Sequence, residues 1–498
     1  MSAVLSRRGL IFGGLGAAAT ATLSACGSSS AGPSTAASPA LPANSPIQLA
    51  PGQKTVTAQL TPRQLTLDLG NGVTARTWAY ADSAEGPLIR ATAGDLLRIR
   101  VDNHLPTDTS VHWHGIHLRN SADGVPGVTQ KPIATGGSYL YEFTAPNPGT
   151  HFYHPHVGVQ IDRALYGPII IDDPHDTGAY EAEWIVVLDD WTDGVGKSPD
   201  DILAGYKSQN GTLAGGMGSG GMGGMGGMGG SSSSPLGDAG DIAYPHYLIN
   251  GRVPAAPRTF TAKKGQRVRI RFINAGSDTV FQVALGGHRF TITHTDGYPV
   301  QPVDTDSFYI SMGERFDATV TLADGVFPLV AAPLGKDGRP GWALVRTGSG
   351  AAPEVGTTVS ELSGRGLLAT DLRPIDSAKL PDKDIDKTMN VTLNGQMQPY
   401  AWGLNGQQFP NADPLTLSEG QRVRMQMTNM TMMVHPMHIH GHSWALPGSG
   451  GLRKDTVLVL PMQTIVADLQ ADNPGDWMYH CHNIYHAELG MMTRLQYT

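Results

Sequence analysis

A ten-residue motif that occurs three times is the strongest constraint on the fold of this chain. The copies are "GDLLRIRVDN" (94–103), "GQRVRIRFIN" (265–274) and "GQRVRMQMTN" (420–429), and each runs from a glycine to an asparagine. Polar and apolar residues alternate within each copy, which is typical of a half-buried β-strand. Three such strands, 171 and 155 residues apart, predict three similar domains in one chain.

Length and composition agree with this prediction. A chain of 498 residues has room for about three domains of roughly 150 residues each. The 63 glycines and 35 prolines, with only 16% charged residues, favour a turn-rich β protein. We therefore predict an all-β fold of three consecutive Greek-key β-sandwich domains at 53–175, 176–350 and 351–498. The net charge of -8 argues against nucleic acid as a partner.

The first 26 residues are predicted to be an export signal. Arg7 and Arg8 precede an apolar stretch (9–23) that is too short to span a membrane, a pattern that resembles twin-arginine signals. "LSAC" (23–26) resembles a lipobox, which implies a lipid anchor on Cys26 and a mature protein on the periplasmic side of the cell envelope. The alternative is a soluble secreted protein cleaved near Ala25. Residues 27–52 then form a flexible linker.

The sequence contains only two cysteines, so lipidation of Cys26 leaves Cys481 without a disulfide partner. Cys481 lies between two histidines in "HCHNIYHAELGMM" (480–492). This position suggests that the thiol serves as a metal ligand.

The repeats also align four His-X-His pairs. Positions 18 and 20 after the repeat glycine are histidines in the first and third copies, whereas the middle copy has Val283 and Leu285. A second repeat, "NPGTHFYHPH" (147–156) and "NPGDWMYHCH" (473–482), places two more pairs in the first and third domains. The four pairs are His112/His114, His154/His156, His438/His440 and His480/His482.

The two histidines of each pair point to the same face of a strand, because side chains alternate along it. A single pair of this kind is more often structural than metal-binding, but four pairs in matching repeats predict a cluster of metal ions between the first and third domains. Cys481 must then point to the opposite face, toward a second site. His435, His486 and Met491 complete a cysteine, two imidazoles and a thioether, which is the ligand set of blue copper centres. Zinc accepts cysteine and histidine, but the thioether favours copper.

"HWHG" (112–115), "HPH" (154–156), "HPMHIHGH" (435–442) and "HCHNIYHAELGM" (480–491) resemble the four copper signatures of the multicopper oxidases. The resemblance implies cupredoxin-like domains and four copper ions. It implies a type 1 copper at Cys481, His435, His486 and Met491, a type 2 copper at His112 and His438, and type 3 coppers at His114/His154/His482 and His156/His440/His480. The implied reaction takes four single electrons from a donor and reduces O2 to two water molecules.

Electrons are expected to enter through an exposed histidine edge of the type 1 site and to pass along Cys481. Asp123, in "NSADGVPGVTQKPI" (120–133), resembles the family's acid beside the type 2 copper and is the candidate proton donor. The alternative is a turn-forming Asp-Gly. Some relatives carry an acid directly after the histidine equivalent to His486, whereas this chain has Ala487 and then Glu488, so a role for Glu488 in the proton relay is open.

Methionines are the clue to the electron donor, because thioethers prefer Cu(I). Met217, Met222, Met225 and Met228 lie in a glycine-rich loop (214–235) that is alternatively a plain linker. In "MQMTNMTMMVHPMH" (425–438) alternate methionines suit a strand core, but Met433 matches a Cu(I)-binding methionine of copper-efflux oxidases, although the acid two residues earlier is Thr431 here.

The segments "DDWTDGVGKSP" (189–199) and "GDIAYPHYLINGR" (240–252) resemble bacterial copper-resistance oxidases of the mycobacterial lipoprotein type. This resemblance implies a cuprous oxidase. A laccase that oxidises phenols or a ferroxidase that oxidises Fe(II) is the alternative, and a non-catalytic copper-sequestering protein fits less well because it needs no O2-reducing cluster. A monomer suffices, since one chain supplies every ligand.

Overall fold

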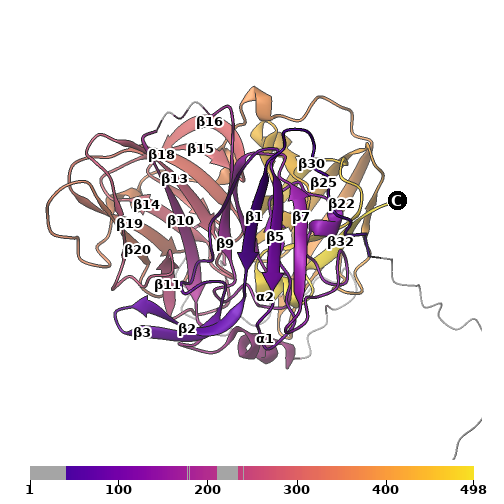
Figure 1. Cartoon of the computed structure of the whole chain (residues 1–498), viewed down its shortest axis with the longest axis horizontal. Coiled ribbons are helices and arrows are strands. Elements are labelled where there is room, and N and C mark those ends of the chain that lie inside the picture. Colours follow the sequence, from indigo (N-terminus) through magenta and orange to yellow (C-terminus); the bar gives the residue numbers. More distant parts are fainter. Residues whose placement is uncertain (1–40, 177, 179, 210–212, 214–233, 239) are drawn as a thin grey trace, which may run out of the picture. The chain divides into compact units, whose positions relative to one another are not determined.

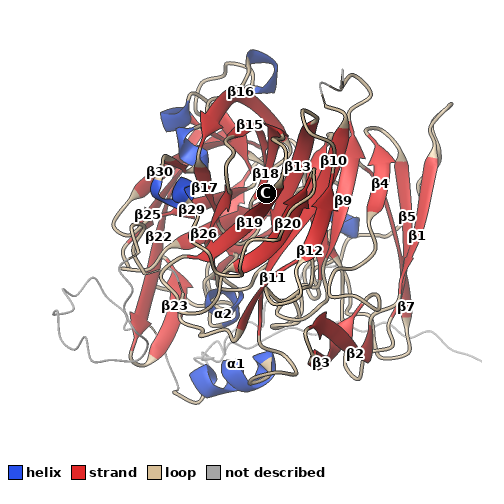
Figure 2. Cartoon of the chain, turned by 90° about the vertical axis from the view of Figure 1, so that its left-hand side faces the viewer, coloured by secondary structure: helices blue, strands red, loops and turns tan. Residues whose placement is uncertain are grey.

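The computed structural model describes residues 41–176, 178, 180–209, 213, 234–238 and 240–498. The predicted export signal, Cys26 and Met217, Met222, Met225 and Met228 lie outside the described residues. Within the described part strands predominate and helices are short (Figure 2).

The first third of the chain forms a three-stranded sheet, a four-stranded sheet and a hairpin. Their orders are β1-β5-β7, β4-β9-β8-β6 and β2-β3. The elements are β1 (Thr55–Leu60), β2 (Arg63–Gly70), β3 (Val73–Ala79), β4 (Ile89–Thr92), β5 (Leu96–Asp102), β6 (His112–His114), η1 (Asn120–Ala122), β7 (Ser138–Thr144), β8 (Gly149–His154) and β9 (Gly167–Asp172).

The middle third forms two six-stranded sheets, β11-β10-β13-β18-β15-β16 and β12-β20-β19-β14-β17-β21. The elements are β10 (Ala182–Trp191), α1 (Pro199–Lys207), β11 (His246–Ile249), β12 (Arg258–Thr261), β13 (Arg267–Asn274), β14 (Phe281–Leu285), β15 (Phe290–Thr295), β16 (Tyr298–Thr305), β17 (Ser307–Ile310), β18 (Arg315–Thr321), β19 (Val326–Pro333), β20 (Gly341–Arg346), η2 (Ser360–Ser363), β21 (Gly366–Leu367), η3 (Ala369–Asp371) and η4 (Asp376–Ala378).

The last third forms a six-stranded sheet, β23-β22-β25-β30-β27-β28, and a five-stranded sheet, β24-β32-β31-β26-β29. The elements are β22 (Lys387–Met397), β23 (Tyr400–Leu404), β24 (Leu415–Leu417), β25 (Arg422–Asn429), β26 (His435–Ile439), β27 (Trp444–Leu446), η5 (Pro447–Ser449), β28 (Leu452–Lys454), β29 (Thr456–Val459), β30 (Thr464–Gln470), β31 (Asp476–Cys481), α2 (Ile484–Glu488) and β32 (Met492–Tyr497).

The three copies of the sequence motif form three equivalent strands, β5, β13 and β25 (Figure 1). Each lies between a preceding parallel strand and a following antiparallel strand. The parallel neighbours are β1, β10 and β22, and the antiparallel neighbours are β7, β18 and β30. The predicted repeat of one strand arrangement along the chain is therefore confirmed.

Burial in the first and third repeats follows the predicted alternation. In β5 the side chains of Leu97, Ile99 and Val101 are fully buried, whereas Arg100 between them is exposed. Burying each such apolar side chain contributes about 1.5–3 kcal/mol. This alternation fixes the register, since a shift by one residue would turn the arginines into the core.

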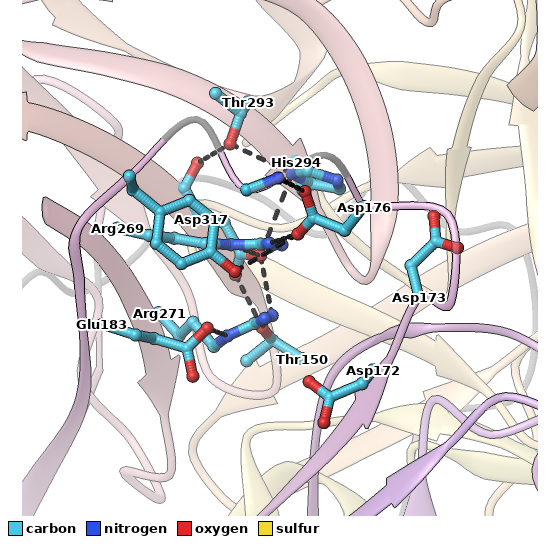
Figure 3. A network of polar contacts seen from close by, with 12 residues as sticks. Thr150, Asp172, Asp173, Asp176, Glu183, Arg269, Arg271, Thr293, His294 and Asp317 are labelled. Carbon is cyan, nitrogen blue, oxygen red and sulfur yellow. Dashed lines mark hydrogen bonds and ion pairs between the residues drawn. The ribbon is translucent and has the colours of Figure 1, made fainter. Parts of the chain in front are cut away.

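The middle repeat departs from the half-buried pattern. Arg267 is exposed, but every other residue of β13 is buried, including Arg269 and Arg271. Figure 3 shows that both guanidinium groups converge on the buried carboxylate of Asp317 in β18, at 2.5 and 3.1 Å. Thr150 of β8 donates a hydrogen bond to the same carboxylate at 2.6 Å. The arginines on the polar face of β13 are therefore buried in ion pairs with β18, and the hydrogen bonds of Thr150 connect β8 to the middle sheet.

Local sequence determines the two α-helices. In α1 the Ser198 side chain accepts a hydrogen bond from the Asp201 amide and Pro199 starts the helix, as helix N-termini favour. In α2 the Asn483 side chain accepts from the amides of Tyr485 and His486. Neither these nor any other described helix is long and apolar enough to cross a membrane.

Candidate metal centre

Strand pairing aligns the four His-X-His pairs. In the first third, His112 of β6 lies opposite His154 of β8. In the last third, His438 of β26 lies opposite His480 of β31. Each antiparallel pair therefore presents two histidine pairs on one face, as the strand period predicts.

Histidines of the first and last thirds meet in three groups whose ligand atoms all lie within 4.8 Å of one another. The groups are His112/His114/His438, His114/His154/His482 and His156/His440/His480. The second and third groups contain the residues that the sequence assigned to the two type 3 coppers, and the first contains both residues assigned to type 2. Rings from the two thirds stack at 3.7 Å between centroids in two places, His114 on His438 and His112 on His440.

Hydrogen bonds fix which ring nitrogen faces the cluster. In four histidines Nδ1 donates to a backbone carbonyl oxygen: His112 to Asp123, His154 to Pro155, His438 to Asp455 and His480 to Cys481. A neutral imidazole with a proton on Nδ1 has a free lone pair on Nε2. In the described part of the chain, Nε2 of His112, His154 and His438 is buried without a hydrogen-bond partner. These orphaned nitrogens fit metal ligands with oriented outer hydrogen bonds.

Burial favours the neutral form of most of the cluster histidines. Burial, followed by the neighbouring histidines, lowers the pKa of most of them well below the ordinary value: His154, His156, His440, His480 and His482. The pKa of His114 is also lowered well below that value, by burial first and then by His438. Neutral imidazole is the form that binds a metal ion, so the residues present fit the copper cluster that the sequence predicts.

A second site lies on the opposite face of β31, as predicted from strand alternation. The Cys481 sulfur is 3.7 Å from His435 Nδ1 and 3.8 Å from His486 Nδ1. Met491 is fully buried, and its carbonyl accepts a hydrogen bond from the Cys481 amide at 3.0 Å. Burial raises the pKa of the Cys481 thiol, so a bound metal cation is needed to hold it as the thiolate.

The expectation of an exposed histidine edge at this second site is wrong. His435 and His486 are both 0% exposed. The His486 ring packs against Trp402 at 4.0 Å between ring centroids, and the Asp241 carboxylate lies 3.8 Å from its Nε2. Tyr400 donates a hydrogen bond to Asp241. These side chains from elsewhere in the chain cover the imidazole, and a local motif does not report them.

The His435 ring has a polar neighbour of its own. Its Nε2 lies 2.8 Å from the hydroxyl of Thr431, which leaves Nδ1 facing the Cys481 sulfur. Met433 is only 3% exposed, whereas Met430 and Met432 are exposed. The prediction that alternate methionines form a strand core is confirmed by Met425 and Met427, which are both fully buried.

Asp123 lies among the cluster histidines. It is fully buried, and its Oδ2 is 2.9 Å from His440 Nδ1 while its Oδ1 is 3.2 Å from His112 Nδ1. The Asp-Gly turn is also present, since Gly124 has a φ of +84° and a side chain there would overlap the Val111 carbonyl. Asp123 therefore stands in an Asp-Gly turn and also contacts two cluster histidines, and its role as a proton donor stays a prediction.

Glu488 ends α2, away from these contacts. Burial raises the pKa of its carboxyl, and Lys207 of α1 is the charged group that lowers it. The contacts of the described residues do not join Glu488 to the cluster histidines.

Asp455 is a site residue that the sequence did not indicate. Its carboxylate lies 3.2 Å from His114 Nε2, and its carbonyl accepts from His438 Nδ1 at 2.9 Å. Arg315 of β18 forms a two-pronged ion pair with it at 2.7 and 2.6 Å. Burial acts to raise the pKa of the Asp455 carboxyl, but the ion pair with Arg315 outweighs burial and holds that pKa well below the ordinary value. No motif marks Asp455, because Arg315 is 140 residues distant in sequence.

The middle third contributes no cluster histidine at the repeat positions. Val283 and Leu285 lie in β14 and are fully buried in the apolar core. Apolar core residues therefore occupy the positions at which the other two thirds have histidines, as the sequence predicts.

Three family models described as "Multicopper oxidase" match residues 63–176, 183–352 and 383–498. The chain is 46% identical to multicopper oxidase MmcO of Mycobacterium tuberculosis, with 99% of this chain and 96% of that protein covered. It is 30% identical to the copper resistance protein A homolog of Pseudomonas syringae pv. tomato, covering 86% and 90%.

The crystal structure of a multi-copper oxidase from Pseudomonas thermotolerans matches with a TM-score of 0.69 and 24% identity, covering 90% of this chain and 100% of that one. Together with the three equivalent repeat strands, this match confirms the predicted fold class of three consecutive cupredoxin-like β-sandwiches.

Proposed function

The chain belongs to the multicopper oxidase family, and we propose that it oxidises Cu(I) to Cu(II) with O2 as the electron acceptor and water as the product. The observation that carries the oxidase chemistry is the pair of centres joined at Cys481. Its sulfur faces His435 and His486, while its sequence neighbours His480 and His482 belong to the histidine cluster. Cu(I) as the donor is supported by the relative named a copper resistance protein and by the methionines around the second site.

The proposed copper ligands are the residues predicted from the sequence. A type 1 ion would be held by Cys481, His435, His486 and Met491, a type 2 ion by His112 and His438, and two type 3 ions by His114/His154/His482 and His156/His440/His480. When bound, copper supplies one-electron redox chemistry, and four ions match the four electrons that convert O2 into two water molecules.

The protein's own residues orient the metal ligands and link the two centres. Backbone carbonyls hold the imidazoles in the tautomer that presents a lone pair to a metal, and burial keeps water away. Cys481 gives a short covalent path, because the residue that binds at one centre is bonded through the backbone to ligands of the other. Electrons from successive donors would use this path one at a time.

We propose Asp123 as the proton donor for O2 reduction. Its carboxyl group lies between His440 and His112, so it could pass a proton from an oxygen atom of its own to the oxygen atoms being reduced. General acids act at such hydrogen-bond distances. Glu488 remains a second candidate for the relay, and its partner among charged groups is Lys207.

Met433 and the methionines of the 214–235 loop remain the candidate guides for substrate Cu(I). The alternatives are a laccase acting on phenols and a ferroxidase acting on Fe(II). They share the copper centres and differ in what reaches the second site. The copper-sequestering alternative differs in lacking turnover.

Steady-state O2 uptake by the copper-loaded protein tests the proposal, with Cu(I), a phenol and Fe(II) as separate donors. We expect the highest kcat/KM with Cu(I) and four Cu(I) consumed per O2. Faster turnover of the phenol or of Fe(II) would assign the protein to one of the alternatives. Copper binding without O2 uptake from any donor would indicate a sequestering protein.

We also propose that the protein acts outside the cytoplasm as a lipid-anchored monomer of three domains with limits at 53–175, 176–350 and 351–498. The support is the twin-arginine pattern, the lipobox-like "LSAC" and the complete ligand set in one chain. Replacement of Cys26 by serine should release the protein from the membrane fraction. Retention of this variant in that fraction would rule out the lipid anchor.

A further inference from the structure

A buried ion pair of the middle third reaches the segment that joins the two metal centres. Lys336 follows β19 and Asp278 precedes β14. Lys336 Nζ lies 2.5 Å from Asp278 Oδ2, and the two side chains are only 5% and 1% exposed. Because a buried ion pair adds little net stability, its place beside the metal centres indicates a further role.

Asn483 connects this ion pair to the proposed copper ligands. Its Nδ2 donates a hydrogen bond to Asp278 Oδ1, and its Oδ1 accepts hydrogen bonds from the backbone amides of Tyr485 and His486. Asn483 directly follows His482 and caps helix α2, which carries His486. One side chain therefore ties ligands of both centres to the middle third.

The backbone of Asn483 also contacts the type 1 cysteine. Burial raises the pKa of the Cys481 thiol, and a hydrogen bond from the Asn483 amide acts in the opposite direction. This amide therefore favours the thiolate form of Cys481. Hydrogen bonding around the cysteine sulfur is one of the factors that tune the reduction potential of a blue copper centre. The position of Asn483 thus bears directly on that potential.

Backbone of the middle third encloses the ion pair. The Ile242 amide donates to Asp278 Oδ2 at 2.9 Å, and the Ser277 carbonyl accepts a hydrogen bond from the Ile484 amide at 3.1 Å. A side chain on Gly240 would overlap the Asp278 carboxylate and lie 2.8 Å from the Lys336 side chain. Buried charges are screened much less than exposed ones, so this pair can act electrostatically on a metal ion nearby.

We propose that Lys336, Asp278 and Asn483 are positioning residues of the type 1 site, which hold the segment from Cys481 to His486 in place and set the reduction potential of the copper ion bound there. This inference rests on the proposed function, which it deepens by naming the residues that regulate electron entry. The three side chains keep their electrons. They act by fixing the ligands and by balancing charge while single electrons pass through the copper ion.

Substitutions that change the charge of the pair should shift the reduction potential in opposite directions. Lys336→Met leaves the Asp278 carboxylate uncompensated, and a negative charge favours Cu(II) over Cu(I), so the potential should fall. Asp278→Asn keeps an acceptor for the Asn483 side chain but leaves the Lys336 charge unpaired, so the potential should rise. Lys336→Arg keeps the charge and should restore the wild-type value.

Potentiometric titration of the blue absorption band in the copper-loaded full chain measures these shifts. Burial raises the pKa of Asp278, whereas Lys336 lowers it, so the titrations would be made at about pH 9 to keep the carboxyl ionised in Lys336→Met. The matched control is Lys379→Met, which removes an ion pair with Asp376 in which the two side chains are 44% and 94% exposed. This control should leave the potential unchanged.

A second measurement needs no copper. In a Cys26→Ser background Cys481 is the only thiol of the chain, and because it is fully buried a thiol reagent reaches it only after local opening. Asn483→Ser keeps a helix-capping side chain but loses the side-chain amide that donates to Asp278. Labelling of the copper-free variant should be roughly ten- to a hundredfold faster, as expected for loss of a hydrogen bond to a charged group.

The outcomes separate this inference from the proposed function. Unchanged potentials in both charge variants, together with wild-type labelling of Asn483→Ser, would overturn the inference and leave the oxidase function standing. Shifts of the same sign in Lys336→Met and Asp278→Asn would overturn the electrostatic role of the pair. A copper-loaded wild type without a blue band would overturn the proposed type 1 site, while faster labelling of Asn483→Ser would still support the anchoring of the segment.

Discussion

Replacement of Asp317 by asparagine tests how the middle third of the chain supports the metal centre. The Asp317 side chain is 1% exposed, and its carboxylate receives Arg269, Arg271 and Thr150 (Figure 3). Asparagine keeps the size of the side chain but removes its negative charge. Two guanidinium groups then remain buried with less compensation, and breaking a buried pair in this way costs about 3–5 kcal/mol.

Each arginine also pairs with a second acid, and these remaining ion pairs reduce the free-energy cost of removing the Asp317 charge. Arg271 keeps Glu183 at 2.8 Å and Arg269 keeps Asp176 at 2.9 Å, so the lower end, about 3 kcal/mol, is expected. In a unit of 150–250 residues each kcal/mol shifts the melting temperature by roughly 2–4 °C. The melting transition of the middle third should therefore fall by about 6–12 °C.

The effect should depend on pH with a defined sign. The two arginines hold the pKa of Asp317 below its ordinary value of 3.8, despite burial. A depressed pKa in the folded state stabilises the protein above the unfolded-state pKa, and this contribution is lost as pH falls through the folded-state value. The difference between wild type and variant should therefore be constant from pH 7 to about pH 5 and shrink below about pH 4.

Differential scanning calorimetry of the copper-free protein would measure this difference across that pH range. The matched control is Asp82→Asn, which breaks an ion pair with Arg63 in which the acid is 87% exposed. Exposed pairs contribute about 0–1 kcal/mol, so the control should melt almost as the wild type does. A shift for Asp317→Asn no larger than that of the control would refute the role of the buried network.

Two further substitutions address the metal centre itself. Cys481→Ser should lower the copper content by one ion per chain in elemental analysis, abolish the blue absorption and reduce O2 uptake to background with every donor; a blue variant would contradict the assignment of this ligand. Asp123→Asn should lower kcat for O2 reduction by roughly 10²–10⁴-fold, while anaerobic reduction of the type 1 copper by the donor keeps its rate. An unchanged kcat would show that Asp123 forms the Asp-Gly turn and does not donate the proton.

The sequence predicted those features that depend on local periodicity. Alternation along a strand correctly separated Cys481 from its two histidine neighbours. The glycine-to-asparagine repeats located three equivalent strands because each copy carries its own apolar face. The ligand groups His114/His154/His482 and His156/His440/His480 came from the family resemblance, and spacing alone left their partition open.

Contacts between distant segments were not predictable. Asp455 has no local motif, and its importance depends on Arg315 and on histidines from another third of the chain. The burial of His486 was missed for the same reason, since Asp241 comes from the middle third and Trp402 from β23. Sequence periodicity shows on which face of a strand a side chain lies, whereas the burial of that side chain depends on tertiary contacts with distant segments.

Arg315 shows what a middle third without cluster histidines contributes to the centre. Its side chain is fully buried, and Nε donates to the Thr150 carbonyl in β8 at 3.0 Å, while both terminal nitrogens pair with Asp455. Thr150 lies on the strand that ends in His154, and Asp455 contacts His114 and His438. An arginine fork has rigid geometry, so one side chain fixes the distance between the two thirds that must supply ligands together. The middle third therefore aligns the metal site without coordinating it, and the apolar Val283 and Leu285 are consistent with that role.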